Sequence, residues 1–259
     1  MEDSLYNLDF IKEIIKKRSK DIAGITIAKG GRMKIGKKKS KVEYLLALFL
    51  IMGVRSFFKN SFITLWFKAK KKVFSKIHLT QDPGLKNFAT KHGIFVDHTD
   101  NPNNPEYIDF LKNKNIDIII NQSQFIIRKP FLNVPKIGIL NRHNALLPKN
   151  RGRLTPFWVL YNKEKETGVS IHFVEEGIDS GPIVVQEKIL VDKNETFTSL
   201  VKKNYQVAPK AMLKALSLIE EGYTDFISNS EVKANYNSIP SIKEAWNYRK
   251  QNFSGLFWD

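Results

Sequence analysis

The sequence predicts an α/β fold with a mostly parallel, Rossmann-like sheet and flanking helices. From about residue 76 onward, short apolar segments with the length of strands alternate with helical segments, as in a parallel sheet. Two of these segments, 116–121 and 136–141, are continuous apolar runs, which are typical of parallel strands buried on both faces. Two later segments, 166–174 and 181–191, alternate apolar and polar residues and predict a closing hairpin.

The first part of the chain predicts two helices around a strand and a loop. Residues 4–19 place apolar side chains at helical spacing, with basic residues entering the last turn. Residues 25–28 predict a short buried strand, and residues 30–41 a loop rich in glycine and lysine that lacks the spacing of a phosphate loop. The apolar run at 44–54 is shorter than the ~20 residues needed to span a bilayer, so it predicts a buried helix.

The remaining elements follow in order along the chain. We expect strands at 76–79 and 93–99 with a helix between them, a turn at 100–106, helices at 106–114 and 196–220, and a tail at 235–252 that folds back as a short helix.

Composition and charge limit the function classes. The 259 residues include no cysteine, which excludes disulfides, thiolate metal ligands and a thiol nucleophile. The net charge is +16, but residues 1–80 carry 19 Lys/Arg against 6 Asp/Glu, while the rest carries 23 against 20. A basic N-terminal part indicates nucleic acid or an anionic membrane as partner, or a solvated lysine-rich surface. The mixed, acidic first residues do not resemble a secretory signal, so we expect a cytoplasmic protein.

The segment 55–74 interleaves aromatic and basic residues. Four phenylalanines before residue 70 and Trp66 alternate with lysines and Arg55. This composition is typical of a helix that lies in a membrane interface, which predicts peripheral contact with an anionic membrane, at the inner membrane surface. The alternative is a helix packed on the domain with a solvated lysine face.

Two polar side chains stand where a strand of the predicted sheet ends. Asn141 is the last residue of the segment 136–141, and His143 follows just past it. Ligands of such sheets bind beyond the carboxyl ends of the strands. An asparagine amide and a histidine N–H can both donate to a developing oxyanion, and Asp179, in a glycine-containing turn, can orient the histidine. The alternative is a capping pair and an ordinary turn residue. His172 alternates with apolar neighbours on a strand, and we expect a structural role for it on a face open to solvent or a shallow cleft.

Residues 137–191 resemble the core of the formyltransferases that use 10-formyltetrahydrofolate. The stretch Asn-x-His-x-x-Leu-Leu-Pro-Lys-x-Arg-Gly at 141–152 matches that family's motif, and 164–186 matches its Glu-Thr-Gly-Val strand, Asp-x-Gly turn and following glutamine. The resemblance implies that Asn141, His143 and Asp179 are the catalytic trio, that 10-formyltetrahydrofolate is the co-substrate, and that no metal is needed.

The resemblance also implies binding residues on each side of the trio. The folate would lie against Ser123, Gln124, Phe125, Ile126, Ala145, Leu146, Leu147, Pro148, Gly177 and Ile178. The amine substrate would meet Lys149, Arg151, Gly152 and Arg153. The segment 121–124 is more polar than this family's pterin wall.

The front of the chain departs from the family pattern. The family opens with a strand and a glycine-containing turn before its first helix, whereas this chain opens on that helix, so we expect the first strand to be missing. Such a gap leaves backbone groups of two neighbouring strands unpaired unless another segment fills it. A basic, aromatic insertion occupies about 30–75, within a catalytic domain expected at 1–220, and a short extension follows at 221–259.

Three amines are candidate acceptors by resemblance. The stretch 147–169 is most similar to enzymes that formylate nucleotide-linked amino sugars for surface polysaccharide. Initiator methionyl-tRNA comes second, because the basic N-terminal part suits RNA, and glycinamide ribonucleotide third. A hypothesis of another class is a non-catalytic, membrane-surface binding protein on a decayed formyltransferase fold, which the missing strand and the segment 55–74 favour.

Overall fold

The computed structural model describes residues 7–28, 40–76, 84–230 and 234–252 of the chain. The helices are α1 (Asn7–Arg18), the 3-10 turn η1 (Ser19–Asp21), α2 (Lys41–Lys76), α3 (Leu85–Lys91), α4 (Pro105–Lys112), α5 (Lys129–Leu132), α6 (Thr155–Tyr161), α7 (Phe197–Glu220) and α8 (Ile242–Asn252). The strands are β1 (Ile25–Ala28), β2 (Val96–Thr99), β3 (Ile118–Asn121), β4 (Gly138–His143), β5 (Arg151–Gly152), β6 (Glu166–Phe173), β7 (Ile183–Leu190) and β8 (Tyr236–Asn237). The predicted α/β class is confirmed.

The central sheet has the order β3-β4-β6-β7. β3 and β4 are parallel, with Asn121 opposite Asn141, and β4 pairs antiparallel with β6, with Asn141 opposite His172. β6 and β7 form the predicted hairpin. The carboxyl ends of β3 and β4 therefore lie side by side, and the register brings a histidine of β6 to the same place.

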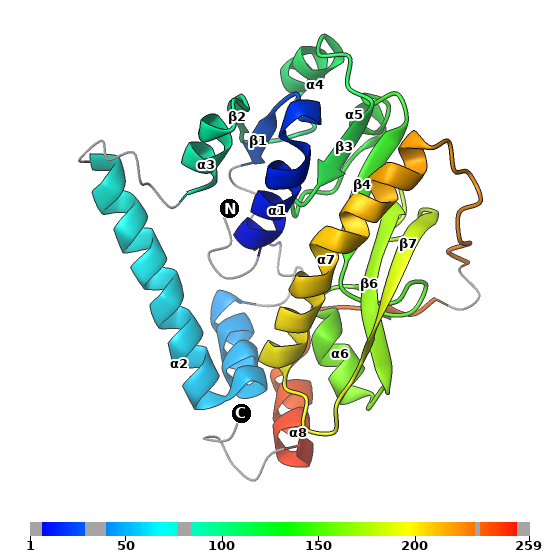
Figure 1. Ribbon diagram of the computed structural model, residues 1–259. Helices are drawn as coiled ribbons and strands as arrows, with labels where there is room; N and C mark the ends of the chain where they lie inside the picture. Colours follow the sequence, from blue (N-terminus) through cyan, green and yellow to red (C-terminus); the bar gives the residue numbers. More distant parts are fainter. Residues whose placement is uncertain (1–6, 29–39, 77–83, 231–233, 253–259) are drawn as a thin grey trace.

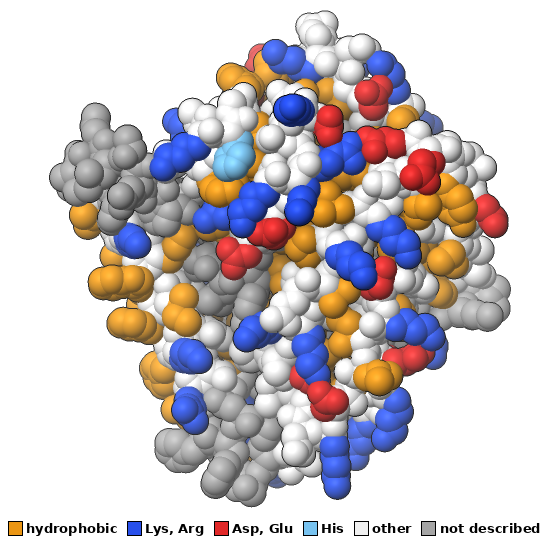
Figure 2. All heavy atoms as spheres, viewed as in Figure 1, with side chains coloured by type: hydrophobic (Ala, Val, Ile, Leu, Met, Phe, Trp, Pro, Cys, Tyr) orange, Lys and Arg blue, Asp and Glu red, His pale blue; other side chains and the backbone are white. Residues whose placement is uncertain are grey.

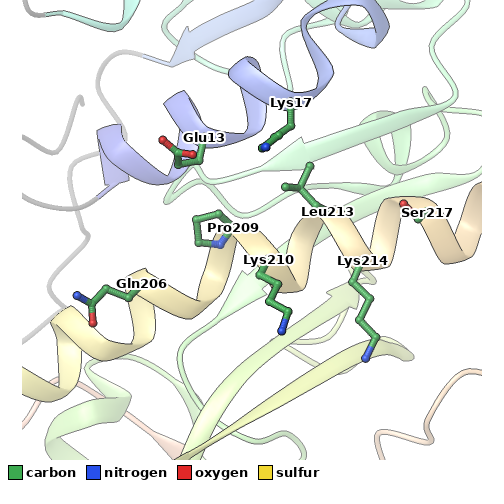
Figure 3. A pocket seen from close by; sticks show the side chains of 8 residues that line it. All are labelled: Glu13, Lys17, Gln206, Pro209, Lys210, Leu213, Lys214 and Ser217. Carbon is green, nitrogen blue, oxygen red and sulfur yellow. The ribbon is translucent and has the colours of Figure 1, made fainter.

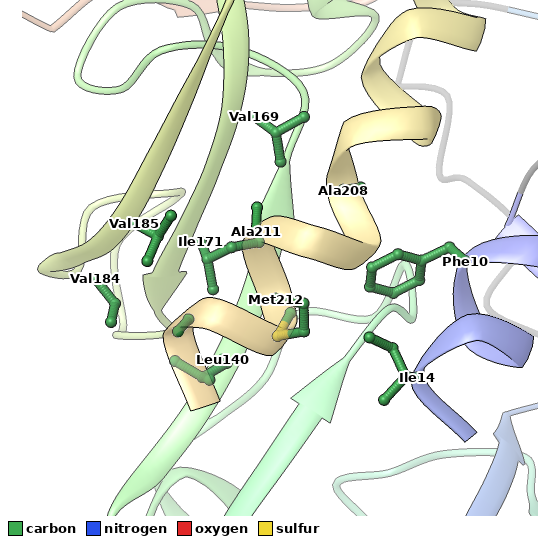
Figure 4. Packing of buried hydrophobic residues seen from close by; sticks show 11 residues of the cluster. Phe10, Ile14, Leu140, Val169, Ile171, Val184, Val185, Ala208, Ala211 and Met212 are labelled. Atoms are coloured by element: carbon green, nitrogen blue, oxygen red, sulfur yellow. The ribbon is translucent and has the colours of Figure 1, made fainter. Parts of the chain in front are cut away.

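Helices α1 and α7 cover one face of this sheet (Figure 1). Figure 4 shows their apolar side chains meeting those of the strands in one core. Phe10 and Met212, from the two helices, and Leu140 and Ile171, from β4 and β6, are each at most 1% exposed. α7 begins at a capping box in which Thr196 Oγ1 accepts from the backbone nitrogen of Ser199 at 3.1 Å. This capping and the apolar spacing explain why the helix predicted at 196–220 is found.

A second, two-stranded sheet joins β1 and β2 in parallel. Among the described residues, β1 pairs with β2 alone and β3 with β4 alone, so each has one strand edge without a partner strand. Helix α1 packs on both units, because Leu8 and Ile15 contact the β1–β2 side and Phe10 contacts the central core. The described strands are thus interrupted between β1 and β3, which agrees with the gap expected from the missing first strand.

Several boundaries differ from the sequence-based expectation. Lys76, expected to open a strand at 76–79, is the last residue of α2, and the rest of that segment lies outside the described residues. Most of the loop expected at 30–41 also lies outside them, and Lys41 already belongs to α2. His143, expected just past its strand, is the last residue of β4 because it pairs with Ser170 of β6.

Helix α2 is two helical pieces joined at Gly53, which has φ 77° and ψ 167°. Such a kink releases carbonyl groups at the end of the first piece. The guanidinium of Arg249, on α8 and 2% exposed, donates to the carbonyls of Leu50 (2.7 Å) and Ile51 (3.2 Å). The first piece is half-buried rather than fully buried, since Leu45 and Leu46 are exposed. No helix in the described part of the chain is long and apolar enough to cross a membrane.

Candidate active site

The predicted trio converges beside the ends of β3 and β4. His143 Nδ1 lies 3.5 Å from Oδ2 of Asp179, and Asn141 lies on the same strand two residues earlier, so both side chains share one face of the sheet. His143 is 6% exposed. Asp179, in the turn that follows β6, is 36 positions beyond His143 in the chain, yet the two side chains meet in one cluster.

Both ring nitrogens of His143 face oxygen acceptors. Nε2 lies 2.7 Å from the backbone carbonyl of Asn150, which accepts only, so this nitrogen carries a proton. Nδ1 faces the carboxylate of Asp179 at a distance longer than a normal hydrogen bond. The Nε2 bond holds the ring, and the longer contact directs Nδ1 toward Asp179.

Asp179 occupies a strained turn that its neighbours hold in place. Its φ is +49°, a left-handed conformation that a short polar side chain tolerates. Its Oδ2 accepts from the backbone nitrogen of Gly152 at 2.9 Å. The side-chain nitrogen of Asn229 donates to the carbonyls of Asp179 and Gly181, both at 2.8 Å. Gly152 therefore holds the carboxylate and Asn229 holds the backbone of the turn, and both lie outside the turn.

Gly152 contributes its backbone amide to the site. It pairs with Asn237 of β8 and has φ +98°. A Cβ at this position would lie 2.2 Å from the carbonyl oxygen of Asn237. Only glycine therefore allows β5 to approach β8 closely enough to present this N–H to Asp179.

A second histidine, His172, belongs to the same cluster. It is 1% exposed, with Nε2 3.4 Å from Asn141 Nδ2 and 3.7 Å from Asp179 Oδ1. Burial lowers its pKa to about 4 against the attraction of Asp179, and the charges of His143 and Arg151 add to the lowering. The expectation that His172 lies on an open face is wrong: it is neutral at pH 7 and touches two members of the trio.

The neutral state of His172 fixes the amide of Asn141. Nδ1 of His172 lies 2.7 Å from the carbonyl of Phe173, so Nδ1 carries the proton and Nε2 accepts from Asn141. The amide oxygen of Asn141 correspondingly faces Nε2 of Gln122 at 3.5 Å. The second N–H of the Asn141 amide is then the donor available to a ligand. Sequence reasoning placed His172 on a strand between Ile171 and Phe173 but did not predict its contacts with Asn141 and Asp179.

Asn150 joins the site to the end of the chain. It is 2% exposed, and its side-chain nitrogen donates to the carboxylate of Glu164 at 2.9 Å. Its side-chain oxygen accepts from Asn237 at 2.7 Å, and its backbone nitrogen donates to Asn235. The carbonyl that holds His143 is therefore positioned by residues after α7, which the sequence showed only as a tail.

The predicted folate residues differ in exposure. Ile126 and Ile178 are 78% and 54% exposed, so they offer apolar surface. Ala145 and Leu147 are buried, and their backbone groups bind Ser170 Oγ at 2.7 and 3.0 Å. The loop at 145–148 is thus a fixed wall rather than a set of exposed contacts.

The other predicted folate residues lie beside these in the chain. Ser123, Gln124 and Phe125 follow β3, Leu146 and Pro148 lie in the fixed loop, and Gly177 precedes the Asp179 turn. The backbone nitrogen of Ser123 donates to Asn121 Oδ1 at 2.9 Å, which bends the chain away from the strand end.

The residues predicted to bind the amine substrate differ in burial and in their contacts. Arg151 is 6% exposed and its guanidinium donates to the carbonyl and side-chain oxygen of Asn229 at 2.9 and 3.1 Å. It therefore supports the Asp179 turn instead of pointing at open surface. Lys149 is exposed and Arg153 is half-buried. Arg153 lies near the hydroxyl of Tyr44. Burial raises the pKa of this hydroxyl, and the positive charge of Arg153 offsets part of the rise.

Two surface depressions are lined by residues other than the trio. One, of about 550 Å³, lies between α1 and α7, and Figure 3 shows the side chains of Glu13, Lys17, Lys210 and Lys214 around it. The other, of about 440 Å³, includes Gly177 and the end of β6. The first contains no member of the trio, so the candidate active site is defined by the polar atoms of the trio and not by this depression. Within the described segments, no group of three or more acidic or histidine side chains is placed to hold a metal ion.

Residues 62–216 match the sequence model of the formyl transferase family, and the chain belongs to that family. Methionyl-tRNA formyltransferase of Clostridioides difficile (strain 630) is 34% identical over 139 residues, 53% of this chain and 45% of that protein. The bifunctional polymyxin resistance protein ArnA of Wigglesworthia glossinidia brevipalpis is 33% identical over 176 residues, 66% of this chain and 27% of that protein. The chain spans about half the length of the methionyl-tRNA formyltransferases that it matches.

Solved structures share the fold at lower identity. Glycinamide ribonucleotide transformylase 1 from Symbiobacterium toebii has a TM-score of 0.51 at 20% identity, covering 77% of this chain and 87% of that one. The formyltransferase PseJ from Anoxybacillus kamchatkensis, in complex with UDP-4,6-dideoxy-4-formamido-L-AltNAc and tetrahydrofolate, has a TM-score of 0.51 at 22% identity, covering 67% and 88%. These likenesses establish the formyltransferase fold.

Proposed function

We propose that the protein transfers the formyl group of 10-formyltetrahydrofolate to a primary amine at Asn141, His143 and Asp179. The observation that carries this proposal is the single cluster in which His143 contacts Asp179 at 3.5 Å while Asn141 presents its amide from the same strand face. Membership of the formyl transferase family supports the same chemistry.

The reaction needs donors for an oxyanion and a path for one proton. The amine nitrogen attacks the formyl carbon, and the carbonyl oxygen becomes an oxyanion. The Asn141 amide and the protonated His143 ring stabilise that charge. When the tetrahedral intermediate collapses, the bond from carbon to N10 of the folate breaks. The amine gives up a proton and N10 gains one, and Asp179 is the group that relays it.

Neutral His172 supports this arrangement without contributing charge. Because its Nε2 accepts from Asn141, the amide cannot flip and present its oxygen to the oxyanion. A charged ring in the same position would have to donate instead, and Asn141 would then turn its oxygen toward it. Because the pKa of His172 is low, the ring stays neutral across physiological pH and the Asn141 amide keeps its N–H groups as donors.

The folate would lie between two exposed apolar side chains. Ile126 follows β3 and Ile178 precedes Asp179, so a flat pterin between them would approach the trio from the strand ends. The co-substrate proposal gains support from solved relatives: PseJ, for example, was crystallised with tetrahydrofolate. The complete absence of cysteine fits a reducing compartment, and we assign the protein to the cytoplasm.

We propose the amine of a nucleotide-linked amino sugar as the acceptor. The stretch 147–169 carries this assignment by resemblance, and the formamido sugar nucleotide bound to PseJ shows that a protein with this fold handles such a compound. Initiator methionyl-tRNA is the second candidate, because curated relatives at 30–34% identity are methionyl-tRNA formyltransferases and the front of the chain is basic.

A panel of acceptors tests both parts of the proposal. The full chain is incubated with 10-formyltetrahydrofolate and, separately, with UDP- and dTDP-linked amino sugars, charged initiator tRNA or glycinamide ribonucleotide, while tetrahydrofolate release is followed by absorbance. We expect release with an amino sugar and its loss in His143→Ala. Release with tRNA alone would move the acceptor to the second candidate. No release with any acceptor from protein that binds folate would contradict the catalytic proposal and favour a non-catalytic binding protein.

A further inference from the structure

The second piece of α2 carries an exposed apolar stripe. Phe58, Phe62, Leu65, Trp66 and Val73 are 54–68% exposed. Their spacing of three, four and seven residues places them, with the exposed Ala69, on an arc of about 100° of the helix surface. Phe62 and Trp66 stack at 6.4 Å between ring centroids. The stripe is continuous over about four turns of helix.

The opposite side of the same helix packs on the protein. Phe67 is half-buried in the cluster that includes Leu8, Ile15 and Leu85. The stripe therefore faces away from the body, and Figure 1 shows this piece of α2 along one side of the molecule. In Figure 2 hydrophobic and basic side chains alternate along that same edge. An apolar stripe held outward in this way is available to an external surface.

Exposed lysines border the stripe on both sides. At 100° per residue, Lys59 and Lys70 lie beyond one border, and Lys68 and Lys72 beyond the other. The sequence has no acidic residue between Glu43 and Asp82, while 55–74 holds six Lys and Arg. The second piece of α2, which carries the stripe, is therefore positively charged, with no acidic side chain of its own.

We propose that the second piece of α2 docks the protein on the surface of an anionic bilayer. The apolar stripe would enter the boundary between headgroups and acyl chains, with the helix axis in the membrane plane. The bordering lysines would extend their charged ends to anionic headgroups while their stems cover apolar surface. The aromatic pair Phe62 and Trp66 suits the interfacial depth at which such rings accumulate.

A bilayer fits this face better than RNA or a second copy of the chain. Single-stranded nucleic acid stacks on separate aromatic rings along a basic groove, whereas here leucine, valine and alanine complete a convex apolar strip. A second copy would bring an equally basic rim against this one, since a symmetric interface pairs the same patch with itself. Charge complementarity therefore favours an anionic surface. The docking function is separate from the proposed chemistry and does not depend on it.

Co-sedimentation of the full chain with vesicles tests the proposal. Vesicles of phosphatidylcholine mixed with phosphatidylglycerol are compared with phosphatidylcholine alone, at low and high salt. We expect binding to the anionic vesicles that salt weakens. The double variant Leu65→Gln/Trp66→Gln should weaken that binding at least about tenfold, because it removes two side chains from the centre of the stripe. Lys68→Glu/Lys72→Glu should weaken it as well.

Matched variants separate the stripe from general changes in the surface. Leu190→Gln/Trp246→Gln replaces the same residue types at positions 73% and 41% exposed, outside α2. Lys193→Glu/Lys243→Glu makes the same charge change elsewhere on the exposed surface. Both should bind vesicles as the wild type does, and circular dichroism should show every variant folded. Equal binding by stripe and control variants, equal binding to neutral vesicles, or a lipid-free dimer that the stripe variant dissociates would each overturn the proposal.

Discussion

The backbone nitrogen of Gly152 donates to Oδ2 of Asp179 at 2.9 Å, and this bond joins two loops that are 27 residues apart. β5 and β8 set the position of the donor, and the turn after β6 sets the position of the acceptor. The orientation of the carboxylate toward His143 therefore depends on the short strand pair of β5 and β8. This dependence can be tested without touching any of the three proposed catalytic side chains.

Gly152→Ala should lower the rate of formyl transfer by about ten- to a hundredfold. The new Cβ would lie 2.2 Å from the carbonyl of Asn237, so β5 must move and carry its N–H away from Asp179. Gly222→Ala is the matched control, because Gly222 has φ +79° but no atom within 4 Å of an added Cβ. The control should lose about 1 kcal/mol of stability and keep its rate. Equal rates for the two variants would show that Asp179 does not need this donor.

Asn141→Asp should reduce the rate by about a hundred- to a thousandfold at unchanged fold. The carboxylate has the shape of the amide but no N–H, and its charge opposes that of the oxyanion. Asn113→Asp, at the exposed end of α4, makes the same change away from the site and should have no effect. Stopped-flow or steady-state release of tetrahydrofolate measures both. A normal rate in Asn141→Asp would remove Asn141 from the oxyanion donors.

Asn229→Ala should cost about 2 kcal/mol of unfolding free energy and also slow the reaction. The change leaves the carbonyls of Asp179 and Gly181 without their donor and takes an acceptor from the buried Arg151. Urea unfolding followed by tryptophan fluorescence gives the stability. The expectation fails if the variant is as stable as the wild type, which would place the 229 segment outside the folded site.

His172 should make the protein less stable as the pH falls from about 6.5 to about 4. Its pKa is about 4 when folded and about 6.5 when unfolded, so in this window the unfolded chain binds a proton that the folded chain does not. The loss should approach about 3 kcal/mol at the low end. His172→Gln should flatten this part of the pH profile.

His92→Gln supplies the control for the pH experiment. His92 is exposed at the end of α3, so its replacement should leave the slope between pH 6.5 and 4 unchanged. Thermal unfolding of wild type and both variants across this range gives the comparison. Identical slopes in wild type and His172→Gln would contradict the buried, neutral state assigned to His172.

Local patterns in the sequence predicted most elements that their own residues determine. The hairpin of β6 and β7 and helix α7 follow from periodicity and from the Thr196 cap, and they lie where expected. The trio could be proposed from the end of one strand and a glycine turn. Such features need no knowledge of distant contacts.

The supporting contacts could not be predicted because they depend on register and on long-range packing. His172 meets Asn141 only because β4 and β6 pair antiparallel in one register. Asn229 and Asn237 lie far along the chain, and nothing in their immediate neighbours indicates a role at the site. The kink at Gly53 likewise depends on a distant residue, because Arg249 of α8 binds a carbonyl that the kink releases.

A single-turnover experiment follows the formyl group from the folate to the amine. Protein in excess is mixed with 10-formyltetrahydrofolate labelled at the formyl carbon and with the acceptor identified in the panel, and samples quenched in acid are analysed for labelled formamide product and labelled formate. We expect the label to pass to the acceptor amine at a rate that His143→Ala reduces by at least about a hundredfold. Transfer at the wild-type rate by His143→Ala, or label released only as formate, would contradict this expectation.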